Sequence, residues 1–406
     1  MRIAIYSEVF TPDKNGVATH TKTLKAGLER AGHDVLVVTA DKRIRHHLID
    51  ESNVLRCPAV RLKRAYGFGL GMLVSPRRLK LVRAFAPDII HIQSEFAIGL
   101  SGVFAARKLA LPLVYTVHTM YDDTYVRYII PGPFAGAAKK LLFRYINFLT
   151  RCTNAVIVPS NRARQFLLDD IHAEESKFNQ ISNAIDWSAF DPGQFSEETR
   201  MALRHRIGVL PTKRTAVYLG RLGKEKSLDV LLGWWAEAMR PEDNWQLVIV
   251  GDGPEAGLLR EQVEASGITS MVIFTGAVEN TEVRKYLAIG DVFMTASLSE
   301  NNSISMLEAM ASGLMVLQRY DPGTADQIQI GVNGEFFENS AQMAAKLRRI
   351  SALDETELAE EKKRVRASVR CLDTQTMVNK TQSVYEREVL PHRQETEPEM
   401  AGSSPR

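Results

Sequence analysis

The sequence predicts an α/β protein with parallel sheets, because short apolar runs alternate with longer segments of helical periodicity along most of the chain. With 406 residues, the chain is long enough for two domains that each bury their own core. Hydrophobic residues make up 45% and charged residues 24% of the sequence, which is ordinary for a globular protein. We therefore expect two domains of alternating strands and helices.

The first half contains apolar runs with the length of buried strands. They span residues 2–6, 34–39, 88–93, 111–117 and 154–160. Between the first two runs, residues 19–32 have the pattern of an amphipathic helix that ends at Gly32. The first strand opens the chain with no apolar segment before it, so we expect no signal peptide.

The second half shows the same alternation. Predicted strands span residues 215–220, 246–251, 272–276 and 291–295. Residues 303–313 then form a short apolar helix that is closed by Gly313, and residues 375–390 form a last helix. Residues 392–406 lack apolar side chains that could dock, so we expect a disordered tail.

Two glutamates, Glu300 and Glu308, lie eight positions apart around the start of the predicted helix at 303–313. Glu300 would lie in the loop after a strand, and Glu308 about a turn and a half into the helix. The first free N–H groups of that helix, near Ser303 and Ile304, would form an anion site beside them. Two carboxylates beside a diphosphate site suit a nucleotide sugar, whose hydroxyls are donors. The alternative is a strand–loop–helix turn with one capping and one surface glutamate.

Arg221 and Lys226 follow a predicted strand that ends in Gly220, and Gly251 ends the next strand in a Gly-Asp-Gly turn. This order of strands, cations and glutamates resembles glycosyltransferase family 4, whose members have the GT-B fold. The resemblance implies two Rossmann-like domains whose parallel sheets face each other across a cleft. It also implies a C-terminal helix that crosses back to the first domain.

The resemblance implies a role for each of these residues. Arg221 and Lys226 would bind the donor's diphosphate, Glu308 the ribose hydroxyls and Glu300 the transferred hexose. The donor-binding set would be Gly16, Gly220, Gly251, Asn302, Ser303, Ile304 and Glu308. Asn302 and Ser303 depart from the aromatic-glycine pair that is usual in the family, which bears on donor selectivity.

The same resemblance divides the chain into domains. Residues 1–185 would form an acceptor-binding domain that leans on the membrane, completed by the returning helix 375–391. Residues 186–374 would bind the nucleotide-sugar donor, and 392–406 would be the tail. Residues 182–193 resemble the family's hinge, with Ala184 where a glycine is common.

His118 lies at the carboxyl end of the predicted strand 111–117, where ligands bind in open parallel sheets. A lone histidine is often structural. This one matches a family histidine that contacts the transferred sugar, so the resemblance implies a catalytic role with Arg221, Lys226 and Glu300. Gly16 opens a helix where the family often has a glycine pair at the diphosphate, and Asn15 replaces the first of the pair.

The acceptor is suggested by the residues that follow His118. They look like those of bacterial 1,2-diacylglycerol 3-glucosyltransferases, which make glycolipids for the inner membrane leaflet. Tyr121, Asp122 and Tyr125 would then contact the acceptor. The alternative is that residues 120–128 form a cleft loop around another acceptor.

The charge distribution points to a membrane surface. Residues 1–190 carry 26 Lys and Arg against 16 Asp and Glu, although the whole chain has a net charge of only +3. Helical spacing over 136–151 would place Lys140, Arg144, Asn147 and Arg151 on one side. The opposite side would carry Leu141, Leu142, Tyr145, Ile146 and Leu149. Anionic lipid attracts such a helix. The alternative is an ordinary helix packed on its own sheet, and no nucleic-acid motif accompanies the charge.

We therefore predict a retaining, metal-independent enzyme that moves a hexose, glucose by the resemblance, from a UDP-sugar to diacylglycerol. It would be cytoplasmic and peripheral on the membrane, since no apolar run approaches about 18–20 residues. The few, widely spaced cysteines, Cys57, Cys152 and Cys371, suggest neither disulfides nor a zinc site. The sequence contains no Asp-x-Asp, so Arg221 and Lys226 would neutralise the departing UDP without a metal cofactor.

Several alternatives stay open. The acceptor could instead be a glycosylated lipid, a phosphoinositide, a polyprenyl chain or a small molecule. Within the fold, a phosphorylase or a sugar-nucleotide epimerase is another enzyme class. Outside enzymology, a catalytically silent nucleotide-sugar sensor or scaffold fits the unusual Asn302 and Ser303.

Overall fold

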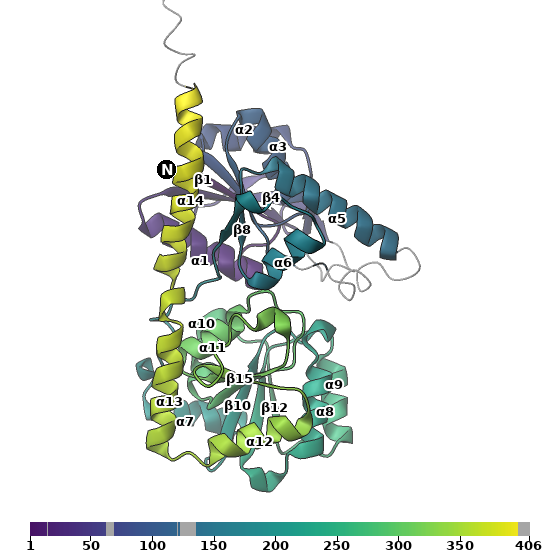
Figure 1. The fold of residues 1–406 in the computed structure, drawn as a ribbon, viewed down its shortest axis with the longest axis vertical. Helices are drawn as coiled ribbons and strands as arrows, with labels where there is room; N and C mark the ends of the chain where they lie inside the picture. The colour runs from purple at the N-terminus through teal and green to yellow at the C-terminus, as the bar shows by residue number, and fades with distance from the viewer. Residues whose placement is uncertain (14, 62–68, 120, 122–134, 397–406) are drawn as a thin grey trace, which may run out of the picture. The chain divides into compact units, whose positions relative to one another are not determined.

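The computed structural model describes residues 1–13, 15–61, 69–119, 121 and 135–396 (Figure 1). The chain divides into two compact units, residues 1–183 with 374–406, and residues 184–373. The first unit's boundary thus lies two residues before the predicted position of 185. Each unit contains one sheet covered by helices.

Unit 1 is built on a sheet whose strand order is β3-β4-β2-β1-β6-β7-β8-β9, with β5 paired to β4. All of its neighbouring strands are parallel except that β3 and β5 run antiparallel to β4. The strands are β1 Arg2–Ser7, β2 Asp34–Asp41, β3 Leu48–Ile49, β4 Val54–Arg61, β5 Gly69–Gly71, β6 Ile89–Ile92, β7 Leu113–Thr116, β8 Ala155–Val158 and β9 Phe178–Gln180. The helices are α1 Gly16–Arg30, α2 Pro76–Phe85, α3 Ala97–Leu109, α5 Ala135–Cys152, α6 Asn161–Asp169 and α14 Thr374–Thr396.

Unit 2 contains an all-parallel sheet in the order β12-β11-β10-β13-β14-β15. Its strands are β10 Arg214–Leu219, β11 Trp245–Val250, β12 Val272–Gly276, β13 Val292–Thr295, β14 Met315–Arg319 and β15 Gly334–Phe337. Its helices are α7 Glu197–Ile207, α8 Leu228–Ala238, α9 Ala256–Ala265, α10 Asn280–Ala288, α11 Ile304–Ala311, α12 Ser340–Ser351 and α13 Glu355–Ser368.

The predicted strands form, and the structure adds β3, β4, β5, β9, β14 and β15. The added strands were missed because they are short or carry polar residues. Strand β4, for example, contains Arg56 and Pro58 and lies toward the edge of its sheet. An edge strand tolerates proline and charge, so it lacks the continuous apolar run of a central parallel strand.

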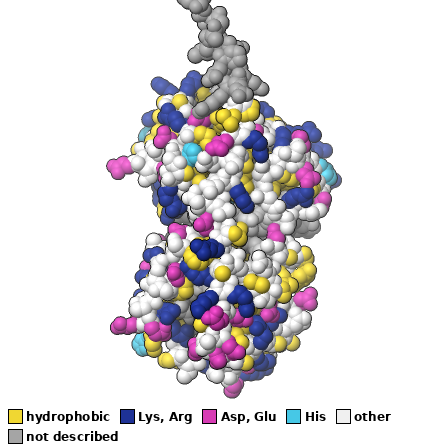
Figure 2. All heavy atoms as spheres, turned by 60° about the vertical axis from the view of Figure 1, so that its left-hand side comes forward, with side chains coloured by type: hydrophobic (Ala, Val, Ile, Leu, Met, Phe, Trp, Pro, Cys, Tyr) yellow, Lys and Arg dark blue, Asp and Glu magenta, His cyan; other side chains and the backbone are white. Residues whose placement is uncertain are grey.

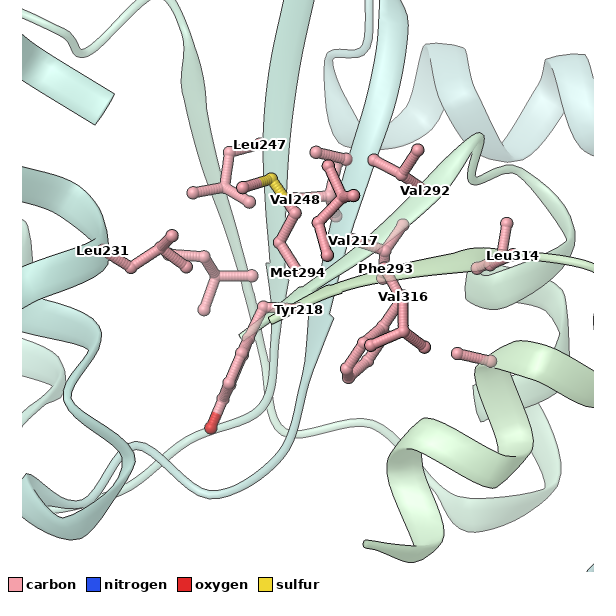
Figure 3. Close-up of a cluster of buried hydrophobic side chains, with 14 of the residues drawn as sticks. Val217, Tyr218, Leu231, Leu247, Val248, Val292, Phe293, Met294, Leu314 and Val316 are labelled. Carbon is pink, nitrogen blue, oxygen red and sulfur yellow. The ribbon is translucent and has the colours of Figure 1, made fainter. Parts of the chain in front are cut away.

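The core of unit 2 shows why its central strands read as unbroken apolar runs. Val217 in β10, Val248 in β11 and Phe293 in β13 are each almost fully buried, because helices cover both faces of a parallel sheet. Figure 3 shows these side chains in one cluster, from which the Tyr218 hydroxyl points away. That hydroxyl donates a hydrogen bond to the Arg221 carbonyl, 3.0 Å away, and so ties the sheet to the loop after β10.

Helix α14 belongs to unit 1, although it follows the last residue of unit 2 in the chain. It lies along α1, where a side chain at Gly27 would meet the Val378 methyl group at 2.4 Å (Figure 1). The helix continues to residue 396, and His392 contacts the Ala110 carbonyl oxygen. The predicted disordered tail from 392 is therefore wrong for residues 392–396, and 397–406 lie outside the described residues.

Candidate functional site

The loops that follow β10 and β11 pack backbone against backbone. Gly251 has a φ of +144°, and a side chain there would lie 1.9 Å from the Gly220 carbonyl oxygen. The Leu222 N–H donates to the Asp252 carbonyl oxygen at 3.0 Å, which joins the two loops. Only glycine permits this approach. The two predicted glycines therefore shape the start of the loop that carries Arg221 and Lys226.

Lys226 and Glu300 lie together although 74 residues separate them. The Lys226 Nζ is 2.6 Å from the Glu300 Oε1. Strand β10 neighbours β13, so the loops that follow these strands share one edge of the sheet. The Ser299 hydroxyl donates to the Glu225 carbonyl oxygen at 2.9 Å and holds the two loops together. The structure thus brings together one predicted diphosphate ligand and the predicted hexose ligand.

The Glu300 carboxyl is ionised in this setting. Burial alone would raise its pKa, but the charge and hydrogen bond of Lys226 outweigh that effect. Hydrogen bonds from Ser297 and Ser303 act in the same direction, so the pKa of Glu300 lies below its ordinary value. Glu300 is therefore a hydrogen-bond acceptor at neutral pH.

Glu308 differs from Glu300 in every respect that sets its charge. It lies in the second turn of α11, and no described residue hydrogen-bonds to its carboxyl group. Burial without a partner raises its pKa from 4.5 to about 8. A ligand that offers hydroxyl donors would supply the stabilisation of the carboxylate that the protein withholds.

The start of α11 corrects one prediction. The Ser303 N–H is not free, because it donates to the Gln327 Oε1 at 2.8 Å. Gln327 also donates back to the Ser303 carbonyl oxygen at 3.3 Å. Within the described ranges, the N–H groups of Ile304, Ser305 and Met306 have no acceptor, so the free N–H groups begin one residue further into the helix than predicted.

Sequence reasoning missed Gln327, and no local signal marks it. It lies 24 residues after Ser303, in the loop between β14 and β15, and contacts α11 only through the tertiary fold. Asn302 is buried as well, with 9% of its surface exposed. The backbone of Ser303, one of the two residues that depart from the family pattern, is therefore held by an amide side chain from another loop.

In unit 1, the loop after β1 leads into α1. The helix begins at Gly16, and the Asn15 Oδ1 accepts a hydrogen bond from the Ala18 N–H at 2.9 Å. Asn15, which stands where the family often has a glycine, thus caps the helix. The Asn15 Nδ2 is buried without a partner among the described residues.

His118 lies in a buried polar cluster at the carboxyl ends of β6 and β7. Its Nε2 is 2.6 Å from the Gln93 Oε1, and its ring packs edge-on against His20 with the centroids 4.6 Å apart. Burial, with smaller contributions from His20 and His91, lowers the pKa of His118 well below its ordinary value. His118 is therefore a neutral imidazole. His91 and Gln93 were predicted only as strand residues, and no sequence pattern marked His20.

Of the three residues predicted to contact the acceptor, the structure describes only Tyr121. Tyr121 is 1% exposed, and its hydroxyl donates to the Glu95 Oε2 at 2.9 Å. Tyr121 was predicted to contact the acceptor or the membrane, but it is a core residue that is hydrogen-bonded to a buried carboxylate. Asp122 and Tyr125 lie outside the described residues.

Helix α5 presents a mixed basic and apolar surface. Lys140, Arg144 and Arg151 are exposed, as predicted. Leu141, expected on the packed side, is 70% exposed, and Phe148 is 43% exposed. These five positions lie within about 100° of one another on a helical wheel.

Asn147 was expected among the exposed polar residues of α5. Its Nδ2 instead donates to the Ile171 carbonyl oxygen at 2.7 Å, after α6. Asn147 therefore holds the helix on its domain rather than facing solvent. Figure 2 shows the molecule turned so that the left-hand side of Figure 1, away from α5, comes forward; on this face too, Lys and Arg side chains lie among exposed hydrophobic ones.

Within the part of the chain that the structure describes, no cluster of three or more His, Cys, Asp or Glu side chains could hold a metal ion. The helices of that part are too short or too polar to cross a lipid bilayer.

Comparison with known proteins matches both halves of the chain to families. Residues 14–188 match the family described as Glycosyltransferase Family 4, and residues 200–367 match Glycosyl transferases group 1. An alpha-monoglucosyldiacylglycerol synthase from Acholeplasma laidlawii is 31% identical, over 86% of this chain and 87% of the relative. Its namesake from Streptococcus pneumoniae is 32% identical, over 79% and 72%. A GDP-mannose-dependent alpha-mannosyltransferase from Corynebacterium glutamicum is 31% identical, over 82% and 76%.

Solved structures agree on the fold. The crystal structure of Anabaena HepE in complex with UDP superposes with a TM-score of 0.72 at 19% identity, over 95% of this chain and 100% of HepE. WaaG, a glycosyltransferase involved in lipopolysaccharide biosynthesis, superposes with a TM-score of 0.67 at 16% identity, over 96% and 99%. With its two parallel-sheet units and these relatives, the chain belongs to glycosyltransferase family 4 and has the GT-B fold.

Proposed function

We propose that this glycosyltransferase is retaining and metal-independent and moves glucose from UDP-glucose to the free hydroxyl of diacylglycerol at the inner membrane leaflet. The observation that carries the donor half is the contact of Lys226 with Glu300; Glu308, whose carboxyl has no hydrogen-bond partner among the described residues, adds to it. Two relatives named alpha-monoglucosyldiacylglycerol synthase, each covering most of this chain, support the sugar and the acceptor.

The donor would bind across the loops after β10 and β13. Lys226 has three N–H donors, so it can keep Glu300 while it takes a phosphate oxygen. Arg221 offers a second cation from the same loop, and the N–H groups of Ile304 to Met306 add dipoles at the start of α11. Glu300 would accept from a hexose hydroxyl and Glu308 from the ribose.

Catalysis would consist of neutralising the departing UDP. As the bond between the sugar and the diphosphate breaks, negative charge grows on the phosphate oxygens, and preorganised cations stabilise that charge. Arg221 and Lys226 would do this without a metal. Glu300 is held by Lys226 and Glu308 would be engaged by the ribose, so neither is suited to act as a covalent nucleophile. We therefore favour front-face transfer, in which a donor phosphate oxygen accepts the acceptor's proton.

The surface of α5 supports the part of the proposal that concerns the acceptor. Exposed Lys140, Arg144 and Arg151 would attract anionic headgroups, while Leu141 and Phe148 would enter the interface. A lipid acceptor needs such contact because diacylglycerol stays in the bilayer. Unit 1 would then bring His118 to the membrane surface.

A second donor is a real alternative, because a GDP-mannose-dependent alpha-mannosyltransferase matches this chain at 31% identity. The test is to incubate the purified protein with UDP-glucose, UDP-galactose or GDP-mannose and vesicles that contain diacylglycerol. Product mass and anomeric coupling by NMR would identify the glycolipid. We expect an α-glucosyl lipid from UDP-glucose. A mannosylated product overturns the donor assignment, and nucleotide release without lipid dependence overturns the acceptor.

A further inference from the structure

A buried chain of polar contacts runs from the C-terminal helix to the candidate catalytic histidine within unit 1. The Tyr385 hydroxyl on α14 is 2.6 Å from the His91 Nδ1. The His91 Nε2 is 2.7 Å from the Thr116 Oγ1, and the Gln93 Nε2 lies 3.1 Å from the His91 Nε2 and 3.3 Å from the His91 Nδ1. The Gln93 Oε1 is 2.6 Å from the His118 Nε2.

We propose that Gln93, His91 and Tyr385 are positioning residues that set the tautomer and ring orientation of His118. The inference rests on the proposed contact between His118 and the transferred sugar. It assigns to α14 a part in organising the site, 294 residues along the chain from His91.

Gln93 decides which nitrogen of His118 carries the proton. A neutral imidazole has one donor and one acceptor nitrogen, and a carbonyl oxygen only accepts. Because Oε1 of Gln93 faces the His118 Nε2, that nitrogen carries the hydrogen and Nδ1 is the acceptor. An acceptor nitrogen can take the hydrogen of a sugar hydroxyl, whereas a donor nitrogen would meet the hydroxyl oxygen. The opposite orientation of the Gln93 amide would impose the opposite tautomer.

The remaining members hold Gln93 and the ring in place. His91 is fully buried between Tyr385 and Thr116, so its ring has no freedom to rotate away from the Gln93 amide. On the other side of His118, the His20 ring packs edge-on. Residues held by such outer contacts keep the geometry that catalysis needs.

Because burying these polar side chains costs free energy, we infer that the arrangement has a function. Burying Gln93, His91 and His20 is unfavourable compared with apolar side chains of similar size. Burial lowers the pKa of His91 to about 3 and of His20 to about 4, so both are neutral and serve as dipoles rather than charges. Departures of this kind from apolar packing concentrate at functional sites.

The test uses the full chain with Gln93→Leu and Tyr385→Phe. The second variant removes one hydroxyl and keeps the ring that packs against His91. Tyr6→Phe is the matched control, because it removes a buried phenol hydroxyl of β1 and keeps the main-chain contact in which the Gln93 N–H donates to the Tyr6 carbonyl oxygen at 2.8 Å. Ring nitrogens are followed by NMR on protein labelled with 15N-histidine, with His118 assigned by its loss in His118→Ala.

In the parent protein we expect His118 as the neutral tautomer with its hydrogen on Nε2. Gln93→Leu should move both His118 nitrogen signals, and Tyr385→Phe should move those of His91 and, by less, those of His118. Tyr6→Phe should move neither. Unchanged His118 signals in both variants overturn the proposal, whatever the protein's activity. If Gln93→Leu does not fold, Tyr385→Phe decides alone.

Kinetics separate this proposal from the proposed function. We expect kcat to fall by roughly 10- to 100-fold in Gln93→Leu, the scale of a misplaced reacting group, and by less in Tyr385→Phe. The affinity for UDP, which unit 2 would bind, should not change. If His118→Ala keeps the parental kcat, the sugar contact is wrong, yet the ring signals still decide whether Gln93 and Tyr385 position His118.

Discussion

At the scale of single residues, the pKa of Glu300 is lowered, whereas burial raises the pKa of Glu308 to about 8. We expect the two side chains to affect UDP affinity differently. Glu308→Ala should weaken UDP by about 2 kcal/mol, or roughly 30-fold, the scale of a hydrogen bond to a charged group. Glu300→Ala should spare UDP affinity or improve it, because it releases Lys226 for the diphosphate. Turnover should fall in both. Calorimetry with UDP measures this, and equal losses of affinity would refute the assigned roles.

The raised pKa of Glu308 should make UDP affinity depend on pH. In the free protein burial raises the pKa of its carboxyl to about 8, and ribose donors would lower that pKa by favouring the carboxylate. Binding below pH 8 should therefore release a proton. Affinity should rise with pH by at most about tenfold per unit and level off above pH 8.

The control for this prediction is Glu308→Gln, which should bind UDP without that slope between pH 7 and 8.5. Its stability gives a second check. A carboxyl whose folded-state pKa is raised destabilises the fold as pH rises from about 4.5 to 8. Glu308→Gln should therefore unfold at a higher temperature than the parent at pH 9. A parental slope in the variant would exclude Glu308 as the titrating group.

If Arg221 and Lys226 stabilise the departing UDP, the reaction should need no metal ion. Neutralising either residue, as Arg221→Gln or Lys226→Gln, should lower kcat by roughly 10²-fold or more, the scale of a lost electrostatic stabiliser. EDTA should leave the rate of the parent protein unchanged. Initial rates with and without EDTA and Mg²⁺ measure this. A strict requirement for added Mg²⁺ would replace the metal-free mechanism.

At the scale of secondary structure elements, α5 is the surface that we expect to meet lipid. Replacing Lys140, Arg144 and Arg151 together by Gln should weaken binding to anionic vesicles by up to about 3 kcal/mol, at about 1 kcal/mol per charge. Cosedimentation measures this. The matched control replaces three exposed cations of unit 2, Arg206, Arg260 and Lys363, by Gln and should sediment like the parent. If both triple variants behave alike, α5 is only a packed helix.

At the scale of the whole molecule, the charge is unevenly divided along the chain. Residues 1–190 carry an excess of Lys and Arg, whereas the whole chain is close to neutral. Binding to vesicles should therefore rise with anionic lipid and fall with added salt, because exposed charges are screened over about 8 Å at physiological ionic strength. UDP binding should vary much less with lipid. Equal sedimentation with neutral and anionic vesicles would contradict a charge-driven membrane contact.

The sequence by itself determined the fold class and the central strands. Parallel strands buried on both faces must be continuous apolar runs, so β10, β11 and β13 are visible without any tertiary information. The positions of Arg221, Lys226 and Glu300 after the ends of strands were predicted too, where ligand residues are usual, but their roles were implied only by the family resemblance. Strand β4 was not predicted, because Arg56 and Pro58 interrupt its apolar run near the edge of the sheet.

Only the tertiary structure decided which polar groups meet. Gln327 reaches Ser303 from another loop, and Tyr385 reaches His91 from the far end of the chain. The burial of Tyr121 against Glu95 likewise has no local signature. Spacing along a chain specifies which face of an element a side chain occupies, but the partner across that face depends on how the elements pack. The same packing buries the Glu308 carboxyl without a hydrogen-bond partner among the described residues and thereby raises its pKa.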